Sequence, residues 1–232
     1  MDRQPSGRRY YPVFLDLEGR LAVVVGGGRV AERKVLSLLD ARAEVRLVSP
    51  KVTPGLAKMA REGRITWQER MFSSEALDGA WLVIAATDDP GVQDEVYREA
   101  VIKRIFCNSV DEPRICSFIV PGVVRRGDMC LAVSTSGRSP ALARRFRQEL
   151  EGSMTSDLGT YVALLGELRD LVLSMHQDDG TRAELCRAIA DKKVQGLFEQ
   201  GRWDEIKKWA VSTLGQGAGI IVERHRAQMD RS

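Results

Sequence analysis

Three consecutive glycines, Gly26–Gly28, point most directly to chemistry in this sequence. With Ala31 they give the pattern G-x-G-x-x-A, whose fixed positions are Gly26, Gly28 and Ala31. The first glycine allows a tight turn, the second lets backbone N–H groups approach a pyrophosphate, and the third small residue lets a helix pack closely on a strand. The alternative is a glycine-rich turn that binds nothing. We expect a dinucleotide here, with its pyrophosphate at the positive end of the helix dipole.

Further polar groups follow the other expected strands. They are Ser49-Pro50-Lys51, Thr87-Asp88 and the segment from Asn108 to Asp111. In an open parallel sheet, ligands bind outside the carboxyl ends of the strands, so these segments and the glycines should meet at one edge.

The second of these strands lacks the acidic residue that usually holds the adenosine ribose. Lys51 could attract a 2′-phosphate, which favours NADP, or it could be a solvated surface lysine. Backbone groups and Ser49 could instead hold the adenosine, which leaves NAD open. The residues alone do not decide between the two coenzymes.

Asp111 is the carboxylate that we single out for catalysis. It follows a strand end near which a nicotinamide ring would lie, and it could accept a proton as hydride leaves for the coenzyme. On the local pattern alone, an aspartate that forms a turn before Pro113 is the alternative.

A second polar segment, 134–140, leads into a helix that carries Arg144, Arg145 and Arg147. Hydroxyls, a helix N-terminus and guanidinium groups suit a ligand rich in carboxylates. A capped helix with a solvated basic face is the competing interpretation.

The elements that must position these groups alternate over the first hundred residues in the manner of βαβ units, which predicts a parallel sheet. The expected strands are 21–25, 43–48, 65–67, 82–86 and 105–108, and the expected helices are 29–40, 53–62 and 90–103.

The rest of the chain has a different pattern. Residues 117–134 read as two strands joined near Gly127-Asp128, and Ser139-Pro140 begins a helix. From about 151 the chain reads as helical, with 181–199 and 202–214 as two helices and a frayed last dozen residues. The predicted fold class is therefore α/β, a Rossmann-like parallel sheet with a small α+β dimerisation region and a C-terminal helical domain. The expected boundaries are 1–113, 114–151 and 152–232.

Composition excludes several classes of function. A net charge of +3 over 232 residues gives no argument for nucleic acid or a membrane surface, and no apolar run is long enough to span a bilayer. The first nine residues lack the apolar core of a signal peptide, so we expect a cytoplasmic protein. The four cysteines contain no C-x-x-C pair, so we expect buried thiols and no protein metal site.

These motifs, taken in order, resemble those of the precorrin-2 dehydrogenase and siroheme synthase N-terminal family. The resemblance covers roughly residues 10–151. The matching segments are 11–17, 26–34, 85–89, 108–111, 117–121 and 134–143.

The resemblance implies oxidation of precorrin-2 to sirohydrochlorin with NAD as acceptor, by a homodimer whose strands are exchanged around 114–151. It favours NAD over NADP, and it places Asp111 on the family's catalytic aspartate. It also leaves open the insertion of iron or cobalt, which some members perform. The cofactor-binding residues that we expect are Gly26, Gly27, Gly28, Arg29, Val30, Ser49, Pro50, Lys51, Thr87 and Asn108. The residues expected to bind the substrate are Arg114, Ser134, Ser136, Arg138 and Arg145.

Two other classes of function are possible. A regulatory module could sense NAD(H) without chemistry, but it would predict a DNA-binding segment or a partner domain, and we find no convincing recognition helix or basic patch. An NAD(P)-dependent reductase of another small substrate would need a Tyr-x-x-x-Lys pair or a histidine donor, and neither occurs in a suitable place.

Overall fold

The computed structural model describes residues 9–110, 112–175 and 177–231. The chain divides into two compact units. The first runs to Val120 and includes Ser136–Arg138, and the second holds Pro121–Thr135 and the chain from Ser139 onward. The division expected from the sequence, at 113 and 151, stays a prediction.

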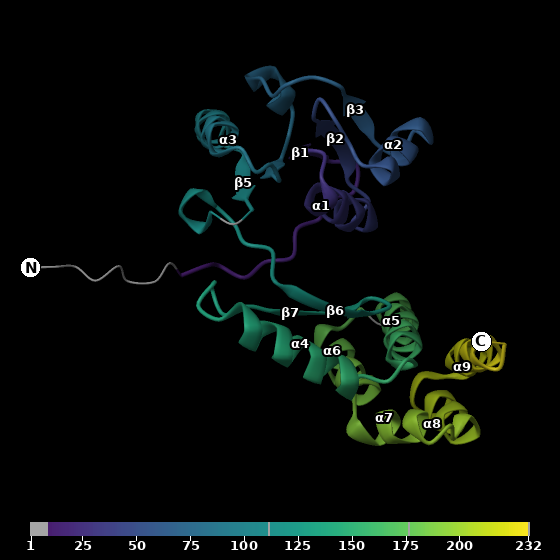
Figure 1. Ribbon diagram of the computed structural model, residues 1–232. Helices are drawn as coiled ribbons and strands as arrows, with labels where there is room; N and C mark the ends of the chain where they lie inside the picture. Colours follow the sequence, from purple (N-terminus) through teal and green to yellow (C-terminus); the bar gives the residue numbers. More distant parts are fainter. Residues whose placement is uncertain (1–8, 111, 176, 232) are drawn as a thin grey trace, which may run out of the picture. The chain divides into compact units, whose positions relative to one another are not determined.

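The first unit is built on a five-stranded parallel sheet with the strand order β3-β2-β1-β4-β5 (Figure 1). Its strands are β1 (Leu21–Val25), β2 (Glu44–Val48), β3 (Thr66–Gln68), β4 (Leu82–Ala85) and β5 (Phe106–Ser109). Its helices are α1 (Arg29–Asp40), α2 (Pro54–Arg61) and α3 (Pro90–Lys103), with short 3-10 turns η1 (Ser74–Leu77) and η2 (Pro113–Ile115). The predicted Rossmann-like class is confirmed. Strands β2 and β3 are added on one side of β1, and β4 and β5 are added on the other, which puts a topological switch point between β1 and β4.

The side chains of β1 point alternately into two hydrophobic cores, one on each face of this sheet. Ala22 and Val24 pack in one core with Val35 of α1, and Val23 and Val25 pack in the other with Val96 of α3. A strand buried on both sides must be apolar throughout, which explains the continuous run Leu21–Val25. Helices therefore pack on both faces of the sheet, and its carboxyl edge is where a ligand would bind.

The second unit begins with a two-stranded antiparallel sheet, β6 (Gly122–Arg126) and β7 (Met129–Val133), which pair only with each other among the described residues. The expected hairpin is confirmed, but its first strand begins at Gly122 and not at Ser117. Ser117 instead returns to β5: its N–H donates to the Cys107 carbonyl at 2.7 Å, and its Oγ accepts from the Cys107 N–H at 2.7 Å.

Helices complete the second unit. They are α4 (Pro140–Ser153), α5 (Leu158–Met175), α6 (Asp179–Ile189), α7 (Lys192–Glu199), α8 (Trp203–Leu214) and α9 (Gln216–Met229). α4 begins as predicted, with Ser139 Oγ accepting from the Leu142 N–H at 3.3 Å. Apolar side chains from α5 to α9 form one core, which includes Leu164, Leu168 and Ile206.

Two expectations for this region are wrong. The segment 181–199 is two helices, because Asp191 caps a new one by accepting from the Lys193 N–H at 2.7 Å. The last dozen residues are largely helical, because Val222 and His225 of α9 are buried and hold that helix in place. Among the described residues, none of the helices is long and apolar enough to cross a membrane.

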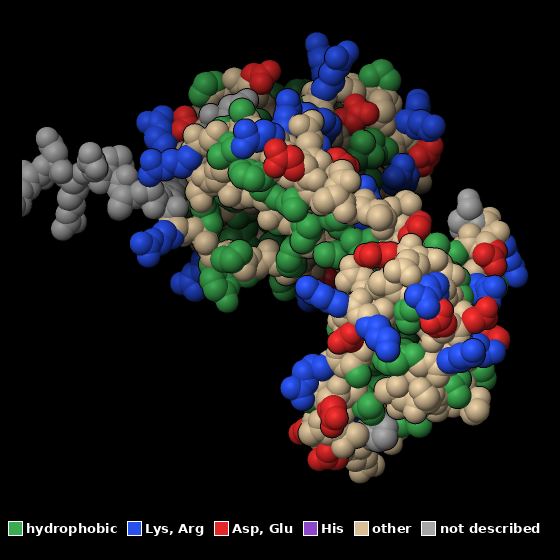
Figure 2. Space-filling model, turned by 90° about the horizontal axis from the view of Figure 1, so that it is seen from below, with side chains coloured by type: hydrophobic (Ala, Val, Ile, Leu, Met, Phe, Trp, Pro, Cys, Tyr) green, Lys and Arg blue, Asp and Glu red, His purple; other side chains and the backbone are tan. Residues whose placement is uncertain are grey.

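The surface carries both signs of charge. In Figure 2, lysine and arginine side chains are interspersed with aspartate and glutamate side chains on the face in view. This distribution agrees with the small net charge of +3.

A buried histidine makes the stability of the second unit depend on pH. His225 Nε2 lies 3.1 Å from Glu167 Oε1, and His225 Nδ1 is buried with no hydrogen-bond partner among the described residues. Burial and the neighbouring Arg224 lower the pKa of His225, because a second ring proton would be buried without an acceptor. The unfolded chain therefore binds a proton that the folded chain does not, and stability falls as pH drops through the ordinary histidine pKa.

We expect the thermal unfolding midpoint to drop more between pH 7.5 and pH 5.5 in the unmodified protein than in His225→Gln, which cannot titrate. Differential scanning calorimetry at the two values measures both drops. Equal drops would contradict this role of His225.

Candidate coenzyme site

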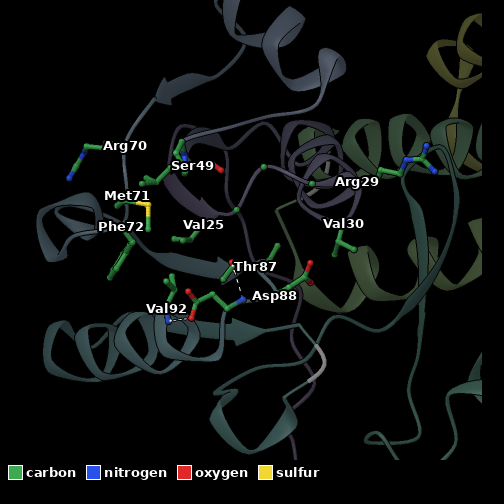
Figure 3. Close-up of a pocket in the computed structure, with 17 residues that line it drawn as sticks. Val25, Arg29, Val30, Ser49, Arg70, Met71, Phe72, Thr87, Asp88 and Val92 are labelled. Atoms are coloured by element: carbon green, nitrogen blue, oxygen red, sulfur yellow. Dashed lines mark hydrogen bonds between the residues drawn. The ribbon is translucent and has the colours of Figure 1, made fainter.

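A cavity of about 340 Å³ opens at the carboxyl edge of the parallel sheet (Figure 3). Eight of the ten expected cofactor residues line it, which are Gly26–Val30, Ser49, Pro50 and Thr87. These residues come from the ends of β1, β2 and β4, which the strand order places side by side. The cavity therefore lies at the switch point of the sheet, where open α/β folds bind their ligands.

Close packing of neighbouring backbone explains why the first two residues of the motif, Gly26 and Gly27, are glycines. Gly26 has a φ of +118°, and a Cβ there would lie 2.1 Å from the Ala86 carbonyl oxygen. At Gly27 a Cβ would lie 1.8 Å from the Lys51 carbonyl oxygen. Neither position can hold a side chain without moving backbone, so both glycines are needed to close the turn.

The environment of Gly28 differs from that of the two preceding glycines. A Cβ there would meet no atom within 4 Å, and the residue has an ordinary φ of −83° at the N-cap of α1. Nothing in the described structure requires glycine at this position. A ligand that lies directly against the backbone would require it, because a side chain would occupy the same space. Gly28 has no side chain to cap α1, so the first turn can offer N–H groups to an anion. These features fit the pyrophosphate of a dinucleotide.

The loop after β2 is fixed by its own hydrogen bonds. Ser49 Oγ donates to the Lys51 carbonyl at 2.7 Å, and Trp67 Nε1 donates to the Ser49 carbonyl at 2.9 Å. The hydroxyl proton of Ser49 is thus used within the loop, although the side chain lines the cavity. Lys51 is exposed and is not among the residues that line the cavity.

The loop after β4 brings two aspartates to the cavity, Asp88 and Asp89. Asp89 caps α3, because its Oδ1 accepts from the Gly91 N–H at 2.8 Å and the Val92 N–H at 3.2 Å. The Thr87 carbonyl accepts from Gln93 Nε2 at 2.6 Å. These bonds fix the loop, so Asp88 projects from a defined backbone.

Asn108, at the end of β5, is buried and does not line the cavity. Its amide Nδ2 donates to the Phe118 carbonyl at 3.0 Å, so it joins β5 to the chain beyond η2. Asp111 lies outside the described residues, and its role stays a prediction.

The buried Cys116 holds the two ends of the segment that contains residue 111. Its Sγ accepts from the Ser109 N–H at 3.1 Å and lies 3.2 Å from the Ser109 carbonyl and 3.4 Å from the Glu112 carbonyl. Cys107 is also buried, and burial raises the pKa of its thiol to about 12. Cys130 and Cys186 are only partly buried, so the expectation of buried thiols is correct for two of the four.

Cys116→Val replaces the thiol by a somewhat larger apolar side chain and removes its hydrogen bonds. We expect a loss of about 1–3 kcal/mol of stability, because the Ser109 N–H is left buried without a partner. Cys116→Ser should lose less, because a hydroxyl can replace part of the bonding. Chemical denaturation of both variants measures the difference, and equal stability of Cys116→Val and the unmodified protein would refute this role.

None of the residues expected to bind the substrate is among those that line this cavity. Arg114 is exposed and pairs with Glu112 at 2.8 Å, which lowers the pKa of the Glu112 carboxyl. Ser136 and Arg138 are exposed residues that cluster with the first unit, whereas Ser134 and Arg145 belong to the second. Arg145 pairs with Glu149 at 3.3 Å. Among the described residues, no group of three or more His, Cys, Asp or Glu side chains could hold a metal ion.

Sequence reasoning missed one wall of the cavity. Arg70, Met71 and Phe72 line it. These residues follow β3, so the rule that ligands bind at strand ends could have identified them. The guanidinium of Arg70 donates to Gln68 Oε1 at 2.9 and 3.2 Å, which fixes this segment beside β3.

Comparison with known proteins agrees with this geometry. Residues 13–122 match a family model described as "Putative NAD(P)-binding", and residues 126–153 match one described as "Sirohaem biosynthesis protein central". Siroheme synthase 3 of Aeromonas hydrophila is 40% identical over 190 residues, which are 81% of this chain and 41% of that protein. Siroheme synthase 1 of Serratia proteamaculans is 38% identical over 209 residues, which are 90% of this chain and 44% of that protein.

Over 81–90% of its length, the chain is similar to these siroheme synthases. The match to the "Putative NAD(P)-binding" model covers the whole parallel sheet of the first unit, in agreement with the prediction for this part of the chain. The chain spans about two fifths of the length of these two siroheme synthases. A solved structure titled "SirC, precorrin-2 dehydrogenase" matches 78% of this chain and 90% of its own, with a TM-score of 0.68 and 27% sequence identity.

Proposed function

We propose that this protein oxidises precorrin-2 to sirohydrochlorin with NAD as the acceptor. The observation that carries the proposal is Gly28, a glycine that the protein's own packing does not require, at the start of α1 in a cavity at the switch point. The similarity to siroheme synthases, and to a structure titled precorrin-2 dehydrogenase, supports the choice of substrate.

When bound, NAD would supply the acceptor for the two electrons that leave the substrate. The backbone N–H groups at the start of α1 would hold its pyrophosphate, and Arg29 and Val30 line the same wall of the cavity. Ser49 and Pro50 would lie beside the adenosine. The absence of an acidic residue after β2 does not exclude NAD, because backbone groups can replace it.

Asp111 is the residue to which we assign the proton. In the sequence it comes two residues after the end of β5, the strand next to β4 in the sheet, and it corresponds to the catalytic aspartate that the resemblance implies. As the substrate loses a hydride to the coenzyme, the carboxylate of Asp111 would accept the proton that the substrate releases from the neighbouring atom. Precorrin-2 is rich in carboxylates, and we assign their binding to Arg114, Ser134, Ser136, Arg138 and Arg145.

We also propose a homodimer in the cytoplasm. No residue of α4 is buried, and Phe146 of α4 and Val123 of β6 are exposed apolar side chains, which a second copy could cover. The four cysteines are unpaired, as expected in a reducing compartment.

An anaerobic assay tests the proposed reaction. Purified protein is mixed with precorrin-2 and NAD, and the absorbance of sirohydrochlorin is followed together with that of NADH. We expect both products in equal amounts and none without NAD. No sirohydrochlorin with NAD or NADP would disprove the proposal. Repeating the assay with ferrous or cobaltous ion tests the chelatase activity of some family members.

A further inference from the structure

The two neighbouring aspartates after β4 have different roles in the structure. The carboxylate of Asp89 is used by the cap of α3. Asp88 is exposed and lines the cavity, and among the described residues no hydrogen bond or ion pair is formed by its carboxylate. In Figure 3 its side chain points toward Val30, at the start of α1.

A carboxylate in this position requires an explanation, given the proposed coenzyme. A pyrophosphate at the start of α1 is negatively charged, and an unpaired carboxylate in the same cavity repels it. Such a residue lowers coenzyme affinity unless it accepts hydrogen bonds from the coenzyme. The hydroxyl groups of a ribose are neutral donors, and one carboxylate can accept from two of them.

The strand order indicates which ribose this is. In folds of this class the adenosine lies beside the end of the second strand, which here is the β2 side of the switch point. Asp88 follows β4, on the other side of β1. A coenzyme that crosses the switch point with its pyrophosphate at α1 therefore has its nicotinamide half over β4.

We propose that Asp88 accepts hydrogen bonds from the hydroxyls of the nicotinamide ribose. The proposal rests on coenzyme binding in this cavity and assigns Asp88 a positioning role, not a catalytic one. By fixing the rotation of the ribose, Asp88 would set which face of the nicotinamide ring is presented toward the β5 side of the sheet.

Two fragments of the coenzyme separate this contact from others. ADP contains the adenosine and the pyrophosphate, and ADP-ribose adds the second ribose without the nicotinamide ring. We expect Asp88→Ala to raise the dissociation constant of ADP-ribose by about tenfold relative to that of ADP, which is the effect of losing a hydrogen bond to a charged group. Isothermal titration calorimetry measures both dissociation constants on the 232-residue chain.

Asp94→Ala is the matched control, because it removes the same charge from an exposed position on α3 that does not line the cavity. It should leave the ratio of the two constants unchanged. Calorimetric melting of both variants checks that they are folded.

Three results would overturn the proposal. If Asp88→Ala leaves the ratio unchanged, Asp88 does not bind the second ribose. If Asp88→Ala weakens ADP and ADP-ribose equally, the contact is to the adenosine half. If the unmodified protein binds neither ADP nor NAD, coenzyme binding in this cavity is wrong as well, so the two failures are distinguishable.

Discussion

Replacing Asp111 with asparagine is expected to lower kcat for precorrin-2 oxidation by about 10²–10⁴-fold, the usual contribution of a general base. Asparagine has nearly the same size and cannot accept the proton. The dissociation constant of NAD should not change, because the proposed contacts of the coenzyme are made by the ends of β1, β2 and β4. Stopped-flow absorbance of sirohydrochlorin measures kcat, and calorimetry measures NAD binding.

Glu112→Gln is a suitable control for this experiment, since it alters the neighbouring charge and breaks the ion pair with Arg114. It should reduce kcat far less than Asp111→Asn does. If Asp111→Asn keeps full activity, Asp111 has no part in the proton transfer, and another group must accept the proton.

The second large effect concerns Gly28. Gly28→Val should raise the dissociation constant of NAD by about 10- to 100-fold. The branched side chain would occupy the place of the pyrophosphate and remove its charge-assisted hydrogen bonds with the backbone. The folded protein has open space at this Cβ and an ordinary φ of −83°, so the thermal midpoint should fall little.

Gly26→Ala provides the contrast. Its Cβ would lie 2.1 Å from the Ala86 carbonyl oxygen, at a φ of +118°, so this substitution should reduce stability itself. Comparing the two variants by calorimetry separates a glycine needed for the fold from one needed for the ligand. If Gly28→Val binds NAD as tightly as the unmodified protein does, the coenzyme does not rest on this turn.

Much of the fold follows from local patterns. The strand Leu21–Val25 and the helix Arg29–Asp40 lie where the apolar run and the glycine motif predict them. The motif also predicts most of one wall of the cavity, because Gly26–Val30 are consecutive and turn from strand to helix together. Ser139-Pro140 marks the start of α4 for a similar reason, since capping depends on two or three adjacent residues.

Other features depend on contacts between distant segments. Arg70, Met71 and Phe72 reach the cavity because β3 pairs with β2. The strand-end rule points to this segment, but a sequence pattern does not give the register of the pairing that brings it to the cavity. Asn108 was predicted to bind the coenzyme, but its amide is used by the Phe118 carbonyl. The adjacent aspartates Asp88 and Asp89 look alike in the sequence, and only the cap geometry separates them.

A crystal structure of the protein with NAD bound is the most direct measurement of the proposed site. We expect the pyrophosphate against the backbone N–H groups that follow Gly28, the adenosine beside Ser49 and Pro50, and the nicotinamide ribose at Asp88. NAD bound at another surface, with this cavity empty, would contradict the proposed site and the mechanism that depends on it.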